Sequence, residues 1–155
     1  DLIVRRPSAG GREVIDVAQL DPRLGLVGDK WSIEVGRDAD PEAETQLTLM
    51  NSRFVALIAQ EKSRWPLAGD QLFVDFDLGR ANIPPGTRLQ LGAAVVEVSA
   101  EPHTGCSKFV ARFGVDAMTL VNSPLGRERQ LRGVNARVVH GGVIRTGDLV
   151  RRITS

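Results

Sequence analysis

One short segment of the sequence gathers residue types that could do chemistry, His103-Thr104-Gly105-Cys106-Ser107-Lys108. Cys106 is the only cysteine of the chain, so it forms no intramolecular disulfide, and a functional role would use its thiolate as a nucleophile, a sulfur carrier or a metal ligand. A helix from about Ser107 to Phe113 would follow, with Lys108 and Arg112 on one face. Because helix N-termini and nearby cations stabilise thiolates, the segment favours a reactive thiol over a buried structural cysteine.

The same segment predicts an anion site. The N–H groups of the first helical turn, the cations Lys108 and Arg112, and the loop residues His103 and Thr104 together can surround an anion or a thiolate. The plainer alternative is a pair of solvent-facing cations beside a loop histidine that bonds the backbone. A protease-like pair of Cys106 with His103 is disfavoured, because residues three apart across a turn seldom adopt that geometry.

Several classes of function are disfavoured by what the sequence lacks. Two histidines and one cysteine offer no zinc constellation, and there is no Gly-x-Ser-x-Gly, P-loop or strand–GxGxxG–helix motif. A net charge of +1 argues against nucleic-acid or membrane-surface binding. No apolar run approaches the roughly 20 residues that span a bilayer. The lone cysteine favours a reducing, cytoplasmic location, and the start at Asp1 without methionine suggests a trimmed N-terminus.

Three Gly-Asp dipeptides recur, at Gly28-Asp29, Gly69-Asp70 and Gly147-Asp148, and each leads into a predicted strand. Turn chemistry explains all three, because glycine supplies positive φ and aspartate bonds its own backbone. The first belongs to a richer loop, 24–31, in which Lys30 and Trp31 follow the glycines and which could approach a phosphate.

The chain of 155 residues is expected to be one domain spanning 1–155, mainly β, with an antiparallel β-barrel or folded sheet and a few short helices. Helices are predicted at about 51–60, capped by Asn51 or Ser52, at 107–113 with Gly114 as a left-handed C-cap, and at 115–121. Gly141-Gly142 predicts a tight hairpin turn. The predicted strands are Leu2–Arg5, Glu13–Leu20, Ser32–Val35, Gln46–Met50, Gln71–Phe76, Arg88–Leu91, Ala94–Ser99, Asn135–His140, Val143–Ile144 and Asp148–Ile153.

The chain resembles the MOSC domain, the family named after the C-terminal domain of molybdenum-cofactor sulfurase. The matching stretches span nearly the whole chain in the expected order, and the run that starts at His103 is the most specific. They are 25–31, 46–51, 69–72, 103–114, 131–134, 136–138 and 147–148.

This resemblance implies a strand-rich barrel in which Cys106 carries sulfur or binds the metal of the molybdenum cofactor (molybdopterin). It also implies either oxotransferase-type reduction of N-hydroxylated small molecules or sulfur transfer with a cysteine desulfurase or molybdoenzyme partner. Pyridoxal phosphate would then belong to the partner desulfurase. The phosphorylated pterin needs cations and loop amides, for which the candidates are Lys30, Arg53, Lys108, Arg112 and Arg132, with His103 and Thr104 beside Cys106. The alternative is a non-catalytic β-barrel that binds a small anionic ligand or a partner protein.

Overall fold

The computed structural model describes residues 1–8, 11–35, 43–103 and 107–153. Its strands are β1 (Leu2–Arg5), β2 (Glu13–Ile15), β3 (Val17–Asp21), β4 (Gly25–Leu26), β5 (Leu47–Asn51), β6 (Leu72–Val74), β7 (Arg88–Leu91), β8 (Ala94–Val98), β9 (Val134–His140), β10 (Gly142–Arg145) and β11 (Val150–Ile153). The helices are α1 (Lys30–Val35), α2 (Ser52–Ala59), the 3₁₀ helix η2 (Lys62–Ala68), α3 (Ser107–Phe113), α4 (Val115–Asn122) and α5 (Pro124–Glu128).

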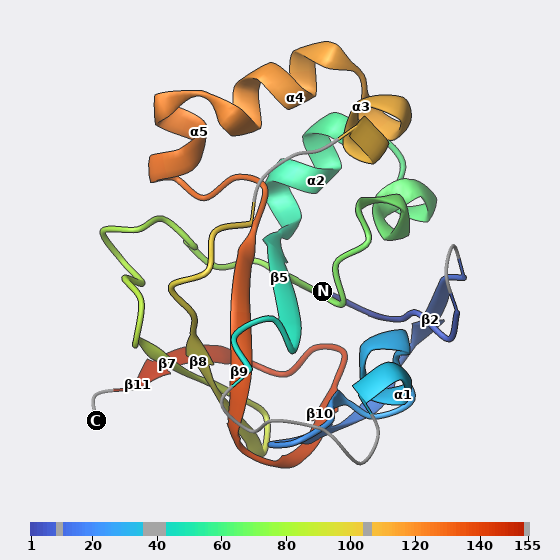
Figure 1. Cartoon of the computed structure of the whole chain (residues 1–155), viewed down its shortest axis with the longest axis vertical. Coiled ribbons are helices and arrows are strands. Elements are labelled where there is room, and N and C mark those ends of the chain that lie inside the picture. The colour runs from blue at the N-terminus through green and yellow to red at the C-terminus, as the bar shows by residue number, and fades with distance from the viewer. Residues whose placement is uncertain (9–10, 36–42, 104–106, 154–155) are drawn as a thin grey trace.

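The strands form a curled eight-stranded sheet in the order β11-β7-β8-β9-β5-β6-β1-β2 and a three-stranded sheet in the order β10-β3-β4. The expected mainly β fold with short helices is confirmed, but the sheet is not a closed barrel, because β11 and β2 stand at its two ends. Nor is the pairing wholly antiparallel, since β5 and β6 run parallel. Helices α2 to α5 and η2 gather at one end of the molecule (Figure 1), whereas α1 packs against β4.

Two apolar cores share the central strands. The first lies inside the curl of the sheet and includes Leu49 and Leu72, while the second, beneath the helices, includes Met50 and Phe73. Because neighbouring side chains of a strand point to opposite faces, β5 and β6 are buried on both faces. The candidate site lies near the start of both strands, since Thr48 of β5 and Gly69, just before β6, line its cleft.

Three predictions of strands and turns were wrong. Residues 13–20, predicted as one strand, form β2 and β3, which belong to different sheets. Gly141-Gly142 does not close a hairpin, because β9 pairs with β8 and β5 whereas β10 pairs with β3, so the chain changes sheets there. Gly142 passes so close to residue 93 that an added Cβ would lie 2.7 Å from the Ala93 carbonyl oxygen. Residues 32–35, predicted as a strand from their β-branched members, belong to helix α1, whose first turn is tied to Asp29.

The three predicted helices are confirmed. Asn51 caps α2, since its side chain accepts hydrogen bonds from the backbone N–H groups of Arg53 and Phe54 at 2.8 and 3.2 Å. Gly114 (φ 93°, ψ 168°) lies between α3 and α4 and is the N-cap of α4; the left-handed C-cap conformation expected of it is not adopted. Among the described helices, none is long and apolar enough to cross a bilayer.

Candidate functional site

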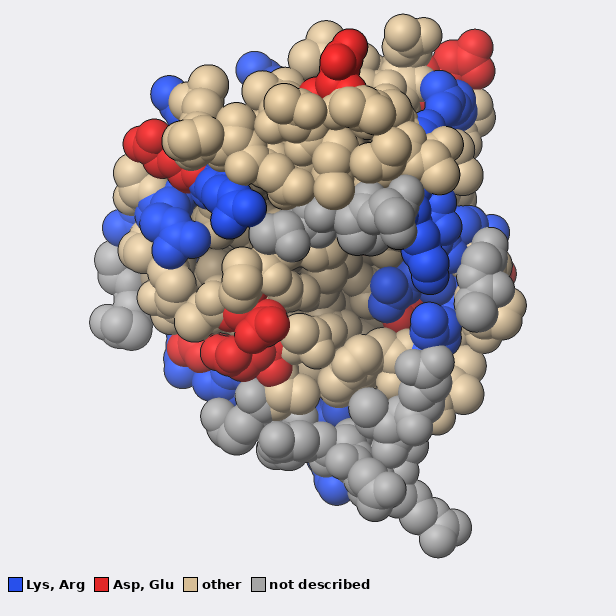
Figure 2. Space-filling view, turned by 45° about the horizontal axis from the view of Figure 1, so that its top comes forward, with Lys and Arg blue, Asp and Glu red and all other residues tan. Residues whose placement is uncertain are grey.

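A cleft of about 230 Å³ opens between α3, the end of η2 and the connection from β1 to β2, and Lys30 at the start of α1 also lines it. Figure 2 shows Lys and Arg side chains gathered around a hollow on the right of this face. None of the described residues that line the cleft is acidic, and six of them carry a permanent positive charge. These are Arg6, Arg12, Lys30, Lys108, Arg112 and Arg132.

The end of η2 holds four of these cations in place. The consecutive carbonyl oxygens of residues 66–69 each accept a hydrogen bond from a different arginine. For the carbonyl oxygens of residues 66, 67, 68 and 69 in turn, the donors are Arg12 Nε at 2.9 Å, Arg112 Nη1 at 2.8 Å, Arg132 Nη2 at 2.8 Å and Arg6 Nη1 at 3.2 Å. The carbonyl end of a helix carries partial negative charge, which stabilises this gathering of like charges.

Arg12 and Arg112 are the pair best placed to receive an anion. Burial, and after it the charges of Arg112 and Arg6, lower the pKa of Arg12 from its ordinary value. A Cβ added at Gly69 (φ 86°) would lie 3.5 Å from Arg12 Nη2 and 3.9 Å from Arg112 Nη1. The absent side chain thus leaves space between two guanidinium groups that backbone carbonyls hold in place.

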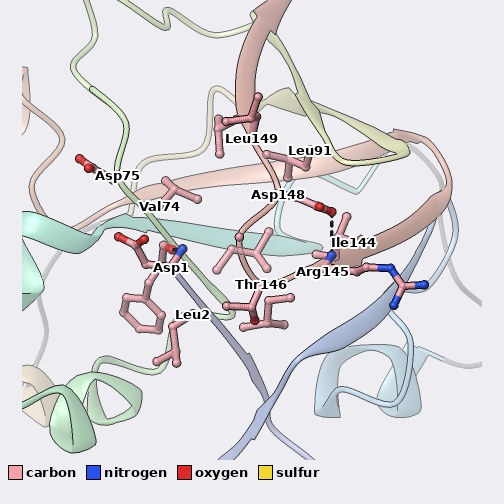
Figure 3. A pocket seen from close by; sticks show the side chains of 15 residues that line it. Asp1, Leu2, Val74, Asp75, Leu91, Ile144, Arg145, Thr146, Asp148 and Leu149 are labelled. Carbon is pink, nitrogen blue, oxygen red and sulfur yellow. Dashed lines mark hydrogen bonds between the residues drawn. The ribbon is translucent and has the colours of Figure 1, made fainter.

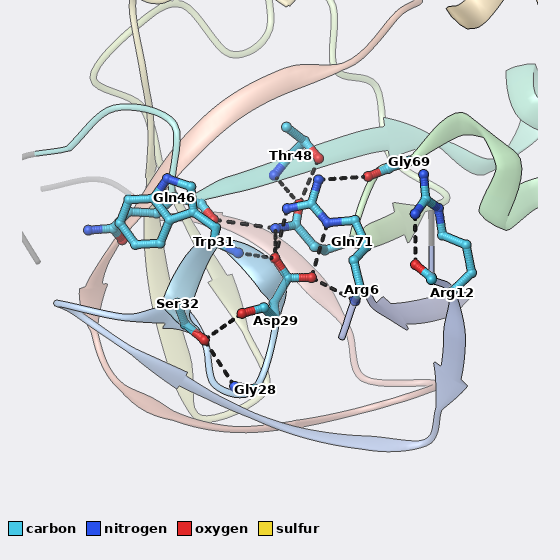
Figure 4. A network of polar contacts seen from close by, with 11 residues as sticks. Arg6, Arg12, Gly28, Asp29, Trp31, Ser32, Gln46, Thr48, Gly69 and Gln71 are labelled. Atoms are coloured by element: carbon cyan, nitrogen blue, oxygen red, sulfur yellow. Dashed lines mark hydrogen bonds and ion pairs between the residues drawn. The ribbon is translucent and has the colours of Figure 1, made fainter. Parts of the chain in front are cut away.

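Asp29 fixes the third arginine. Its carboxylate accepts hydrogen bonds from Arg6 Nε at 3.0 Å and Nη2 at 2.7 Å, from the backbone N–H of Arg6 at 2.7 Å and from Gln71 Nε2 at 3.3 Å (Figure 4). Burial raises the pKa of Asp29, but its bonds to Arg6 and the Arg6 charge outweigh burial and lower it below the ordinary value. Arg6 is therefore largely neutralised and serves more to shape the cleft than to attract a ligand.

Asp70 is fully buried behind the cleft and holds the fourth arginine. Arg132 Nη1 donates to Asp70 Oδ1 at 2.6 Å, and His103 Nε2 lies 3.5 Å from the same oxygen. Burial raises the pKa of Asp70, yet the charges of Arg132 and His103 and their hydrogen bonds lower it overall. The guanidinium of Arg132 also lies over the ring of Phe109, 5.2 Å from its centroid, so α3 packs against this ion pair.

Gly133 makes room for this pair. It has a φ of 117°, and an added Cβ would lie 2.4 Å from the Leu49 carbonyl oxygen and 2.9 Å from Asp70 Oδ2. Both contacts are closer than real side chains allow, so only glycine fits beside this carboxylate.

The structure brings most of the predicted site residues together. Lys30, His103, Lys108, Arg112 and Arg132 all line the cleft. Arg53 does not: its side chain is exposed on α2 and pairs with Asp75 at 2.8 Å. Thr104 and Cys106 lie outside the described residues, while His103 and Lys108, near them in sequence, both line the cleft.

Sequence reasoning missed Arg6 and Arg12 and took the aspartates of two Gly-Asp dipeptides for turn residues. Asp29 and Asp70 instead anchor arginines of the cleft. The recurrence of the dipeptide was the available signal, but their partners lie 23 and 62 residues away in the chain. Within the described part of the chain, no group of three or more His, Cys, Asp or Glu side chains forms a metal site.

A second hollow, of about 320 Å³, lies across β1, β6 and the turn between β10 and β11 (Figure 3). Its lining is largely apolar, with Leu2, Val74, Leu91 and Ile144 among the side chains that face it. Asp148 binds the backbone N–H of Arg145 at 2.8 Å within its own turn. None of the predicted site residues lines this hollow, which makes the cationic cleft the stronger candidate.

Comparison with known proteins decides the family. The family model described as MOSC domain matches residues 44–151, more than two thirds of the chain. The chain belongs to the MOSC domain family. No curated protein matches it significantly. The matched region contains Asp70, Lys108, Arg112 and Arg132, whereas Arg6, Arg12 and Lys30 precede it, so the cleft combines cations from inside and outside the matched MOSC region.

Solved structures show the same fold. YiiM from Escherichia coli is 18% identical with a TM-score of 0.62, and the match covers 99% of this chain and 69% of that one. A structure described as a hypothetical protein is 20% identical with a TM-score of 0.68, covering 99% of this chain and 67% of that one. YuaD from Bacillus subtilis is 15% identical with a TM-score of 0.58, and the match covers 96% of this chain and 91% of that one. Membership of the MOSC family supports a function related to the molybdenum cofactor in general.

Proposed function

We propose that this MOSC protein binds the molybdenum cofactor in the cationic cleft and uses Cys106 as a metal ligand or sulfur carrier. The observation that carries the proposal is the pair Arg12 and Arg112, held by backbone carbonyls on either side of the space beside Gly69. Two adjacent guanidinium groups match a phosphate, because their charge-assisted N–H donors bind its oxygens strongly. Arg12 would use Nη2, since its Nε and Nη1 donate to the carbonyl oxygens of Pro66 and Gly11. The phosphate of a pterin cofactor fits this donor set.

The other cleft residues would orient the rest of the cofactor. Lys30 and Lys108 line the cleft and add positive charge for its anionic groups, while Asp29 and Asp70 hold Arg6 and Arg132 in fixed positions. When bound, the cofactor supplies the redox or group-transfer chemistry. The protein contributes a preorganised cationic surface whose geometry does not have to be rebuilt on binding.

Cys106 is proposed as the reactive thiol because its segment joins two residues of the cleft, His103 and Lys108. A thiolate is a soft ligand, suited to molybdenum or to a persulfide. As a sulfur carrier, Cys106 would accept one sulfur atom from the persulfide of a partner cysteine desulfurase, whose own thiolate would be released. Pyridoxal phosphate would stay with that partner. In an oxotransferase role, the substrates would be N-hydroxylated small molecules.

The decisive experiment measures molybdenum and pterin in protein purified from a cofactor-competent host. Wild type should contain both. We expect Arg112→Gln to retain about ten-fold less cofactor, because it loses charge-assisted hydrogen bonds of about 1.5–3 kcal/mol. Arg53→Gln is the matched control, since it removes an arginine that lies on α2 outside the cleft, and it should retain the wild-type content.

Cys106→Ala separates the two roles of the thiol. A metal ligand predicts loss of molybdenum, whereas a sulfur carrier predicts that only wild type gains the mass of one sulfur atom after incubation with a desulfurase. The proposal fails if wild type holds neither molybdenum nor pterin and gains no sulfur. If Arg112→Gln and Arg53→Gln lose equal amounts of molybdenum and pterin, the assignment of the cleft as the cofactor site is refuted. A wild type that binds inorganic phosphate there but never the cofactor would be the non-catalytic anion binder instead.

A further inference from the structure

A second, smaller cleft of about 80 Å³ lies on the other side of His103 and Arg132 from the first. These two side chains line both clefts, together with Gly133 in the smaller one, so they form the wall between them. The remaining polar lining residues of the smaller cleft are Arg80, Arg127 and Gln130. We propose that this second cleft binds the carboxylate of the substrate.

Charge supports an anionic occupant. None of the described residues that line this cleft is acidic. The side chain of Arg127 is directed by a hydrogen bond from its Nε to the Asn122 carbonyl oxygen at 2.9 Å, which leaves its two terminal nitrogens for a ligand. No hydrogen bond or ion pair joins the Arg80 guanidinium to the described residues, and only its backbone N–H is bonded, to Glu128.

The wall contributes an unsatisfied donor. The side chain of Arg132 is only 9% exposed, and its Nε is buried without a hydrogen-bond partner among the described residues. A buried N–H that lacks an acceptor costs free energy, so its retention at the wall between two clefts needs an explanation. The ion pair is incompletely satisfied on both sides, since Asp70 Oδ2 also lacks a hydrogen-bond partner among the described residues. Arg132 therefore adds positive charge to the wall, and the direct hydrogen bonds to a ligand would come from Arg80 and Arg127.

The backbone around the cleft is also held in an uncommon conformation. Gln130 has a positive φ of 50°, which non-glycine residues seldom adopt. Its side chain donates to the Leu78 carbonyl oxygen at 2.6 Å, and its own carbonyl accepts from Gly133 N–H at 3.0 Å. These bonds fix the turn that carries Arg127 and Arg132 to the two sides of the cleft.

Size sets the class of ligand. At about 80 Å³ the second cleft is roughly a third of the size of the first, at about 230 Å³. This smaller space suits a compact anion such as a carboxylate better than it suits a pterin. With the cofactor in the first cleft, a carboxylate in the second would place the substrate against His103 from the opposite side. The assignment to substrate, though not the anion site itself, rests on the proposed function.

The test uses acetate and inorganic phosphate as probes, with NMR of the imidazole groups as the readout. The chain has two histidines, so His103 reports on the wall while His140, exposed on β9, is the internal control. At constant pH and ionic strength, acetate should shift the His103 signals saturably and leave those of His140 unchanged. The double variant Arg80→Gln/Arg127→Gln should weaken acetate binding about ten-fold and keep the phosphate response.

A second double variant, Arg12→Gln/Arg112→Gln, should show the reverse, with weakened phosphate binding and unchanged acetate binding. Absence of a His103 shift with acetate would overturn the second site. Equal weakening of acetate binding by both double variants would also overturn it, because the His103 shift would then reflect acetate bound in the first cleft. If acetate binds as expected but the protein never holds molybdenum or pterin, the anion site stands and its assignment to the substrate is overturned.

Discussion

The dipeptides Gly69-Asp70 and Gly147-Asp148 look alike in the sequence but have different roles in the structure. Both glycines have positive φ, 86° and 95°, as their turns require. Asp148 is exposed and only closes its own turn, by accepting from the Arg145 N–H. Asp70 is fully buried and neutralises Arg132 across 62 residues of sequence. The glycine is explained by the local turn in both dipeptides, whereas the role of the aspartate depends on which cation the fold brings close to it.

The largest effect should come from Asp70→Asn, which keeps the shape of the side chain but leaves Arg132 buried without a counter-charge. We expect the free energy of unfolding to fall by about 3–5 kcal/mol, as for other broken buried ion pairs. Urea denaturation followed by tryptophan fluorescence measures it. The matched control, Asp148→Asn, should change stability by less than about 0.5 kcal/mol, because it is an exposed turn residue. Similar losses in the two variants would contradict the comparison.

Asp29→Asn should have an intermediate effect, because Arg6 remains partly exposed to water when its partner is lost. A loss of about 1–3 kcal/mol in the free energy of unfolding is expected from broken charge-assisted hydrogen bonds. Combining it with Arg6→Gln tests the pairing. The double variant should lose less than the sum of the two single variants, since they share one interaction. Strict additivity would show that Asp29 and Arg6 act independently.

The smallest effect concerns acid stability. The pKa values of Asp29 and Asp70 are lowered in the folded protein, so near and below pH 4 the unfolded chain binds protons that the folded chain does not. Their contribution is therefore complete at neutral pH and is lost as the pH falls through the folded pKa values. Urea midpoints between pH 7 and pH 3 should fall less steeply for Asp70→Asn than for wild type. Parallel slopes would rule out this contribution of Asp70.

Much of the fold could be predicted because its signals are local. The predicted ranges of β1 and β7 match the observed strands, and the Asn51 cap and the helix from Ser107 follow from neighbouring residues. Closure and sheet changes could not be predicted in this way, because they depend on which distant strands pair. Residues 32–35 were taken for a strand because Ile33 and Val35 are β-branched, but the bonds of Asp29 to the first turn override that propensity.

Part of the cleft lining was predicted from the segment around one cysteine, and part of it, Lys30 and Arg132, from the need of a phosphorylated pterin for cations. His103, Lys108 and Arg112 were found because they flank one cysteine, and the structure places all three on one cleft. Arg12 carried no local signal, since its position is set by the carbonyl of Pro66. Arg53 was expected at the site from the need of a phosphorylated pterin for cations, but its pairing with Asp75 directs it to solvent.

The four successive carbonyls at the end of η2 also have a consequence for folding. The arginines that they receive come from three separate parts of the chain, residues 6 and 12, residue 112 and residue 132. Contacts between such distant segments close long loops and are intrinsically slow to form. The cationic cleft can therefore exist only after the N-terminal segment, η2, α3 and the start of β9 have all assembled. Backbone amides in these segments should accordingly exchange their hydrogens as one cooperative unit. The protein would then become able to bind its ligand only when the whole fold has formed.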